Sequence, residues 1–96
     1  MEASQGFAIT HHKGFHMTFK NGWTISVQWG PGNYCDRYDT DDFMAPVSAT
    51  SWESRDAEIA AWGPDGAMCE WPNGDTVVGR LTPDEVLAIM NDVASR

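Results

Sequence analysis

Two alternating stretches joined by a short connection ending in glycine constrain the fold of this chain more than any other feature. Residues 15–19 read Phe-His-Met-Thr-Phe and residues 23–29 read Trp-Thr-Ile-Ser-Val-Gln-Trp, so every odd position is apolar. A period of two is typical of strands with one buried face. Across the Lys-Asn-Gly connection (20–22), a two-residue turn would put the two apolar sets on opposite faces. A three-residue loop with its glycine in the left-handed conformation instead pairs Phe19 with Trp23, and this is the hairpin that we expect.

A connection of the same kind, His-Lys-Gly at 12–14, predicts another strand before this hairpin. Residues 7–11 contain Phe and Ile at alternate positions, and the glycine that ends the connection again favours a three-residue loop. The expected cross-strand neighbours are Phe7 with Phe19, Ile9 with Met17 and His11 with Phe15.

Two further connections, Pro-Asp-Gly at 64–66 and Pro-Asn-Gly at 72–74, predict a second set of strands over 57–63, 67–71 and 75–81. The expected pairs are Ala61 with Cys69, Ile59 with Trp71 and Cys69 with Val77. The chain is therefore expected to form two three-strand meanders separated by a long connection over residues 30–56.

The end of the chain predicts one amphipathic helix. Thr82 suits the N-cap, Pro83 the first helical position and Glu85 the third, so a capping box is available. Apolar residues then recur at helical spacing and require an apolar surface beneath them; they are Val86, Leu87, Ile89, Met90 and Val93. We predict an α+β fold, a single domain over residues 1–96, with an antiparallel sheet of five to six strands in two meanders and the C-terminal helix packed on one face.

Charge and composition limit the classes of partner. The 96 residues carry a net charge of −8, with 14 acidic residues against six Lys and Arg, and the excess acid follows residue 35. Phosphate-binding surfaces need the opposite sign, so we expect no direct nucleic-acid binding and favour a protein partner with a basic surface, although solubility alone also explains the charge. No apolar run suits a membrane span and no secretion signal begins the chain, so we expect a cytoplasmic protein with reduced thiols and no membrane partner.

The connection over residues 30–56 is acidic and aromatic and has neither strand nor helix periodicity. Connections of this length inside a small domain are usually functional. Its acids do not follow EF-hand spacing, so we expect no calcium site. A solvated acidic surface and a protein-binding surface with aromatic anchors both stay open. The candidate partner-binding residues in this connection are Tyr34, Asp36, Tyr38, Asp39, Asp41, Asp42 and Phe43.

The five tryptophans are many for this length, and the predicted registers divide them between faces. The set expected on the core face is Trp23, Trp29 and Trp71. Trp62 is expected on the opposite face beside Met68 and Val78. The charged residues expected around this cluster are Glu58, Glu70 and Arg80. An apolar cluster with a charged rim is typical of an interface, so Trp62 and Met68 are also candidate partner-binding residues, for a heterologous partner or for a homodimer.

No motif identifies a reaction or a cofactor. The side chains that could bind zinc, or form a nucleophile and its base, lack the spacing of such sites; they are His11, His12, His16, Cys35 and Cys69. The Gly-Pro-Gly at 30–32 cannot cradle a phosphate, because proline has no N–H and no helix follows. We expect no enzymatic activity and no cofactor, and metal binding by these His and Cys residues stays open.

Four stretches of the chain resemble small orphan accessory proteins of tailed phages and prophages. They are residues 14–19 (Gly-Phe-His-Met-Thr-Phe), 23–35, 71–77 (Trp-Pro-Asn-Gly-Asp-Thr-Val) and 81–86 (Leu-Thr-Pro-Asp-Glu-Val). The resemblance covers most of the chain and implies a short phage gene whose product acts in the host cytoplasm. Small acidic accessory proteins of phages often bind and block a host or defence protein, as anti-CRISPR proteins do. The resemblance assigns no binding or catalytic residue.

Three functions fit these patterns. The leading one is a non-catalytic, anti-CRISPR-like inhibitor that occupies a basic or nucleic-acid-binding surface of a host protein through the acidic connection or the Trp62 face. The second is a small-ligand-binding or sequestering protein in which Tyr34, Tyr38 and Trp52 line a pocket. The third is a structural subunit of a phage particle with the Trp62 face as an oligomer interface. A charge-steered interface weakens steeply with ionic strength and an apolar one does not, which separates the first function from the others.

Overall fold

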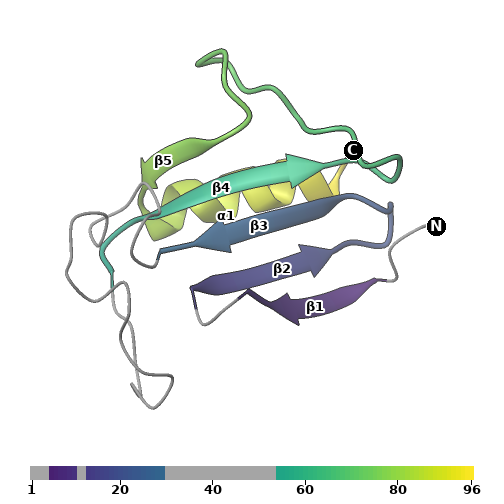
Figure 1. The fold of residues 1–96 in the computed structure, drawn as a ribbon, viewed down its shortest axis with the longest axis horizontal. Coiled ribbons are helices and arrows are strands. Elements are labelled where there is room, and N and C mark those ends of the chain that lie inside the picture. Colours follow the sequence, from purple (N-terminus) through teal and green to yellow (C-terminus); the bar gives the residue numbers. More distant parts are fainter. Residues whose placement is uncertain (1–4, 11–12, 30–53) are drawn as a thin grey trace.

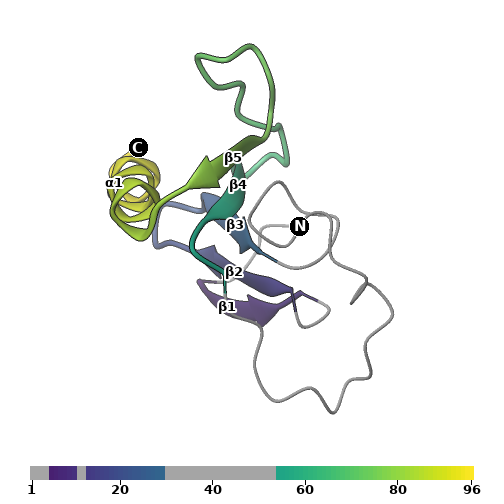
Figure 2. The same ribbon diagram turned by 90° about the vertical axis from the view of Figure 1, so that its left-hand side faces the viewer.

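The computed structural model describes residues 5–10, 13–29 and 54–96. These residues form a five-stranded antiparallel sheet whose strands lie in sequence order, with one helix against one face (Figures 1 and 2). The elements are β1 (Gly6–Ile9), β2 (Gly14–Thr18), β3 (Thr24–Gln28), β4 (Ala57–Trp62), β5 (Val78–Leu81) and α1 (Pro83–Ala94). The predicted α+β class is confirmed. Antiparallel pairing of β3 with β4 joins the two halves of the chain into one sheet.

The hairpin of β2 and β3 has the predicted loop. The Phe19 N–H donates to the Trp23 carbonyl at 2.8 Å, and the Gly22 N–H donates to the Phe19 carbonyl at 2.9 Å. Gly22 has φ 87°, a conformation that glycine adopts without steric cost. The apolar residues of the two strands consequently share a face, as the pairing of Met17 with Ile25 shows.

The predicted register of β1 is wrong by two residues. Phe7 lies opposite Met17 and Ile9 opposite Phe15, because the loop follows Thr10, whose N–H donates to the Gly14 carbonyl at 3.1 Å. Gly14 is therefore the first residue of β2 and not the last of the turn. A Cβ there would fall on the Val27 carbonyl oxygen and 2.8 Å from the Gln28 Cα, so this glycine permits a close approach of strands. Because the register differs by two residues, each side chain of β1 stays on the face of the sheet that was expected. His11, which was expected opposite Phe15, lies outside the described residues.

The second half keeps its predicted turns and loses one predicted strand. The Cys69 N–H donates to the Ala61 carbonyl at 2.8 Å, as the predicted pairing requires. Among the described residues, the expected ladder between residues 57–63 and 67–71 is reduced to an isolated bridge between Trp62 and Met68. Ile59 pairs with Val78 instead of Trp71. The expected ladder pairing of Cys69 with Val77 does not form either.

Side chains explain why residues 70–77 form no strand. The Asp75 carboxylate accepts from the N–H groups of Thr76 (2.6 Å) and Val77 (3.3 Å), and the Asn73 amide donates to the Val77 carbonyl at 3.1 Å. These bonds satisfy main-chain groups that a central strand would pair with its neighbours. The Trp71 ring instead becomes part of the core, and its Nε1 donates to the Thr76 carbonyl at 3.1 Å.

The core lies between the helix and the middle of the sheet. Alternate residues of β3 and β4, such as Ile25 and Ile59, are fully buried against Val86 and Val93 of α1. The predicted capping box is present: the Glu85 N–H donates to the Thr82 hydroxyl at 3.3 Å, and the Glu85 carboxylate accepts from the Thr82 N–H at 3.0 Å. In the part of the chain that the structure describes, no helix is both long and apolar enough to cross a membrane.

Candidate functional site

The acidic aromatic connection lies outside the described residues. Its partner-binding role therefore stays a prediction for every residue assigned to it, namely Tyr34, Asp36, Tyr38, Asp39, Asp41, Asp42 and Phe43. The same holds for the ligand pocket expected around Tyr34, Tyr38 and Trp52.

The Trp62 face is less apolar than the sequence suggests. Val78 lies opposite Ile59 and packs against the core, so it is not beside Trp62 as expected. The reason is that β5 pairs directly with β4, with a register irregularity between Ala57 and Ile59. Met68 is exposed, whereas the half-buried Trp62 ring packs edge-on against His16 with the ring centroids 5.0 Å apart.

Polar groups surround Trp62 and His16. The hydroxyls of Thr18 and Thr24 form a hydrogen bond of 2.8 Å, and both threonines line a hollow of about 380 Å³ with Trp62 and His16. Burial lowers the pKa of His16, which favours the neutral imidazole. The described residues that line this hollow offer hydroxyls, an imidazole and an indole edge, and no Asp, Glu, Lys or Arg is among them.

Other exposed apolar residues lie on the opposite face, over β1 and β2. Phe7 and Ile9 are each 81% exposed, although their pairing with Met17 and Phe15 puts them on the face that α1 covers elsewhere. The helix packs against β3, β4 and β5, and Figure 2 shows β1 and β2 extending beyond it. We call this set, with the exposed Leu87 of α1, the β1–β2 apolar surface; its members are Phe7, Ile9, Phe15, Met17 and Leu87.

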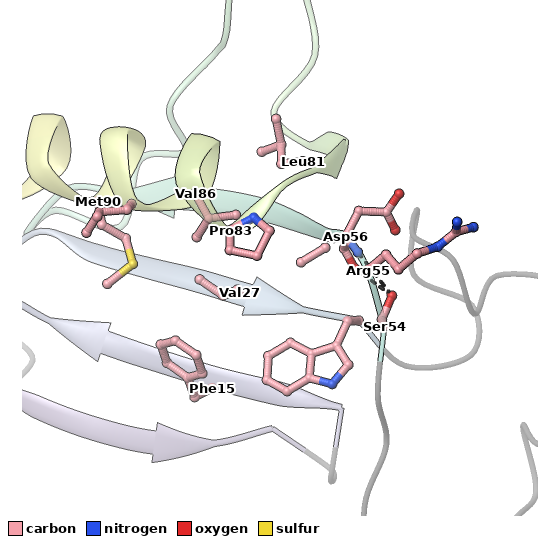
Figure 3. A pocket seen from close by; sticks show the side chains of 12 residues that line it. Phe15, Val27, Ser54, Arg55, Asp56, Leu81, Pro83, Val86 and Met90 are labelled. Carbon is pink, nitrogen blue, oxygen red and sulfur yellow. Dashed lines mark hydrogen bonds between the residues drawn. The ribbon is translucent and has the colours of Figure 1, made fainter.

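A cavity of about 320 Å³ adjoins this surface, and the α1 residues that line it are Pro83, Val86, Leu87 and Met90. Its floor includes Phe15 and Val27, and Val86 and Met90 of the helix overhang it (Figure 3). The Trp29 ring stands edge-on to Phe15, with centroids 6.2 Å apart, and lines the same cavity. The polar residues of the cavity are Ser54, Arg55 and Asp56, which lie together at one end. The site is therefore an apolar hollow with polar groups at one end.

The predicted pairing put Phe7 and Ile9 on the face of the apolar β2 residues, and nothing in the sequence pattern showed that α1 leaves them uncovered. Sheet dimensions are the signal that could have shown this. Adjacent strands lie about 4.8 Å apart, so five strands span about 20 Å, whereas a helix with side chains is about 10 Å wide. One helix cannot cover such a sheet, and a terminal strand is the natural place for the uncovered apolar residues.

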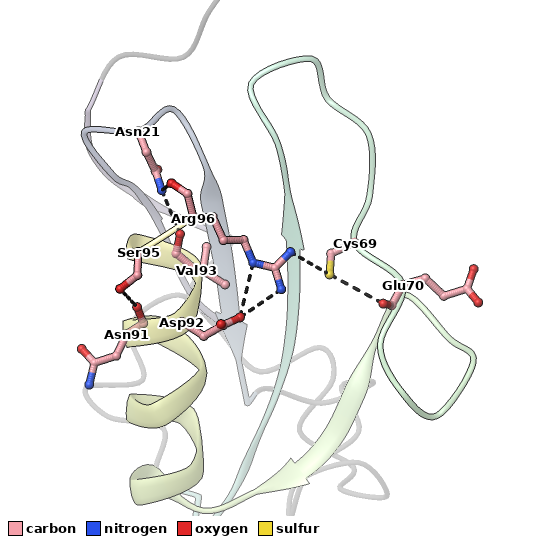
Figure 4. Close-up of polar contacts among 8 residues, drawn as sticks. All are labelled: Asn21, Cys69, Glu70, Asn91, Asp92, Val93, Ser95 and Arg96. Carbon is pink, nitrogen blue, oxygen red and sulfur yellow. Dashed lines mark hydrogen bonds and ion pairs between the residues drawn. The ribbon is translucent and has the colours of Figure 1, made fainter.

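The Cys69 thiol is free and takes part in the contacts of the helix end (Figure 4). Nη1 of Arg96 lies 3.6 Å from its sulfur, while Nη2 forms an ion pair of 2.9 Å with Asp92. The guanidinium carbon is 4.8 Å from the Trp23 ring centroid and 5.9 Å from that of Trp71. Asn21 adds hydrogen bonds from its amide to the carbonyls of Val93 (2.9 Å) and Arg96 (3.1 Å). Cys69 thus belongs to a structural contact between α1 and two loops.

Two of the five metal and nucleophile candidates, His16 and Cys69, are among the described residues, and they do not lie together. His16 lies on the face away from the helix, whereas Cys69 packs against the core. His11, His12 and Cys35 are outside the described residues, and within the described ones no three His, Cys, Asp or Glu side chains could hold a metal ion together. Comparison of the chain with protein-family models, with curated proteins and with solved structures finds no match.

Proposed function

We propose that the chain is a non-catalytic binding domain that contacts a protein partner through the β1–β2 apolar surface. The observation that carries the proposal is the 81% exposure of both Phe7 and Ile9 on the face that forms the core elsewhere in the sheet. Burying side chains of this size yields about 1.5–3 kcal/mol each. Contiguous exposed apolar residues on a small domain mark interaction sites.

The net charge of −8 supports a finer form of the proposal, in which the partner has a basic surface. Acidic residues accelerate the encounter with such a partner, and apolar anchors then slow its release. The acidic connection at 30–56 would supply the first effect and the β1–β2 apolar surface the second. These two roles and the phage resemblance together favour one function. It is the inhibition of a host or defence protein, in the manner of anti-CRISPR proteins.

Binding rates at two ionic strengths test the proposal, once a partner has been captured from host lysate and identified by mass spectrometry. Phe7→Ser is expected to raise the dissociation rate, because an apolar anchor is lost from the complex. The matched control is Met68→Ser, which removes an exposed apolar side chain from outside the β1–β2 apolar surface and should leave both rates unchanged.

The acidic contribution is tested separately with Asp39, Asp41 and Asp42 all changed to Asn. This variant is expected to associate more slowly and with a flatter salt dependence. Tyr38→Ala should act on dissociation, as an aromatic anchor would. If Met68→Ser weakens binding and Phe7→Ser does not, the Trp62 face is the contact and the assignment to the β1–β2 apolar surface is wrong.

The cavity beneath α1 supports a second candidate, the binding of a small apolar ligand. Its volume of about 320 Å³ lies at the lower end of the range of ligand pockets, roughly 300–1,000 Å³. Native mass spectrometry of the purified protein should then detect a retained apolar molecule, and the probe anilinonaphthalene sulfonate should change the fluorescence of Trp29. Absence of both effects would leave the cavity as part of the protein-binding surface.

A further inference from the structure

The outer edge of β1 presents main-chain hydrogen-bonding groups to solvent. In an antiparallel pair, alternate residues of a strand bond to the neighbouring strand. Thr10 bonds to Gly14 of β2, so Ala8 and Gly6 are the other residues of β1 that bond inward. The N–H and C=O groups of Phe7 and Ile9 consequently point away from the sheet.

The two edges of the sheet differ in their protection against pairing with another chain. Beside β5 the ladder is irregular, and Arg80 has φ 58°, the one positive φ of a non-glycine residue within the described ranges. Bulges and charged residues are the usual devices that block an edge strand. β1 pairs without irregularity, and residues 5–10 (Gln-Gly-Phe-Ala-Ile-Thr) contain neither a charge nor a proline.

We infer that two copies of this chain associate through antiparallel pairing of their β1 strands, about a two-fold axis at Ala8. In this register Phe7 lies opposite Ile9 of the second copy and Ile9 opposite its Phe7. Both pairs are hydrogen-bonded pairs, so all the outward main-chain groups of Phe7 and Ile9 are satisfied at once. The strand is thus complementary to itself, as a two-fold interface requires.

The side chains support the same register. Directly opposed residues share a face, so Phe7 of one copy contacts Ile9 of the other on the helix side of both sheets. A two-fold axis normal to the sheet places both α1 helices on this face. The two β1–β2 apolar surfaces then become one continuous surface between the helices. The inference concerns self-association and stands whether or not a heterologous partner uses that surface.

The buried area predicts a weak dimer. Phe7 and Ile9 would together contribute roughly 300 Å² per copy, less than the roughly 800 Å² per partner of a standard stable interface. Repulsion between two chains of net charge −8 opposes association and is screened by salt. We therefore expect reversible dimers at about 100 µM protein, more abundant at higher ionic strength.

Sedimentation equilibrium over a concentration series tests this association at low and high salt. Ile9→Pro removes the outward N–H and no inward hydrogen bond, so it should retain the fold by circular dichroism and remain monomeric. Ile9→Val keeps the N–H and a β-branched side chain, and is expected to dimerise. Met68→Ser controls for self-association through the Trp62 face and should also dimerise.

Disulfide trapping tests the register directly, in a background with Cys35 and Cys69 changed to Ser. Ala8→Cys places two thiols at the axis in a non-hydrogen-bonded pair, where Cα atoms are about 4.5 Å apart and a bridge can form. Thr10→Cys is the matched control, because in this register its two copies lie about 14 Å apart. Rapid oxidation of the first variant and not the second is expected.

Three results would overturn the inference. They are a monomer at all concentrations and salt levels, dimers that Met68→Ser abolishes and Ile9→Pro does not, and equal cross-linking of the two cysteine variants. A wild-type chain that dimerises in this register and binds no captured partner would overturn the proposed function and leave this inference standing.

Discussion

Replacing Arg96 with alanine tests how the end of α1 is held to the sheet and to residues 67–77. The change removes an exposed i,i+4 ion pair of 2.9 Å to Asp92, a kind of contact that contributes about 0.3–0.5 kcal/mol. It also removes a guanidinium 4.8 Å from the Trp23 ring centroid, a geometry that contributes about 0.5–1 kcal/mol at a partly exposed site. The Trp71 ring, at 5.9 Å, adds little because it lies at the limit of such contacts. We expect the free energy of unfolding to fall by about 0.8–1.5 kcal/mol, which lowers the Tm of a domain this small by roughly 3–12 °C.

Urea and thermal unfolding, followed by tryptophan fluorescence, measure this loss. Asp92→Asn removes the ion pair and leaves the ring contacts, so it should cost no more than about 0.5 kcal/mol. Arg96→Lys retains the charge without the planar guanidinium and should lie between the two. If Arg96→Ala and Asp92→Asn destabilise equally, the tryptophan rings contribute nothing and the stacking argument is refuted.

Four further changes test the local structure. Gly22→Val should destabilise by about 1 kcal/mol or more, because it forces a β-branched residue to φ 87°, and an unchanged Tm would contradict the three-residue loop. Gly14→Ala should cost about 1–3 kcal/mol, because its Cβ would displace the main chain at Val27, and tolerance in thermal melting would argue against that close approach. Thr82→Ala should destabilise by about 0.5–2 kcal/mol in urea unfolding. Hydrogen bonds from Thr82 lower the pKa of Glu85, so the stabilisation from its ionised carboxylate is complete above its unfolded-state pKa. The stabilisation from the ionised Glu85 carboxylate should vanish as pH falls through the folded-state pKa. A wild-type free energy of unfolding that still exceeds that of Glu85→Gln in acid would contradict this expectation.

The sequence alone predicted the elements whose determinants are local. The hairpin of β2 and β3 follows from alternation and from the glycine of its loop, and the start of α1 follows from Thr82, Pro83 and Glu85. In each case a few neighbouring residues satisfy their own backbone and fix the direction of the apolar side chains. The α+β class followed from the same local patterns.

A glycine at the end of a short connection predicted the strand register correctly only where the turn itself needed the glycine. The connection ending at Gly22 required a left-handed residue. Gly14 also ends a short connection, but glycine is needed there for another reason. The main chain of β3, which is distant in sequence, leaves no room for a Cβ at this position. The sequence pattern does not distinguish these two reasons for a glycine. The predicted register of β1 was wrong because of this.

The tertiary structure alone decided that β3 and β5 both lie beside β4, and which apolar residues were covered. Direct pairing of β5 with β4 turned Val78 toward the core and left residues 70–77 outside the sheet. The candidate site depends on the same kind of fact, since Phe7 and Ile9 have the alternation of buried residues and differ from Ile25 only in lying beyond the reach of α1. Alternation specifies a face, whereas burial depends on the width of the sheet and the position of the single helix. Those are properties of the packed layers, and no residue encodes them by itself.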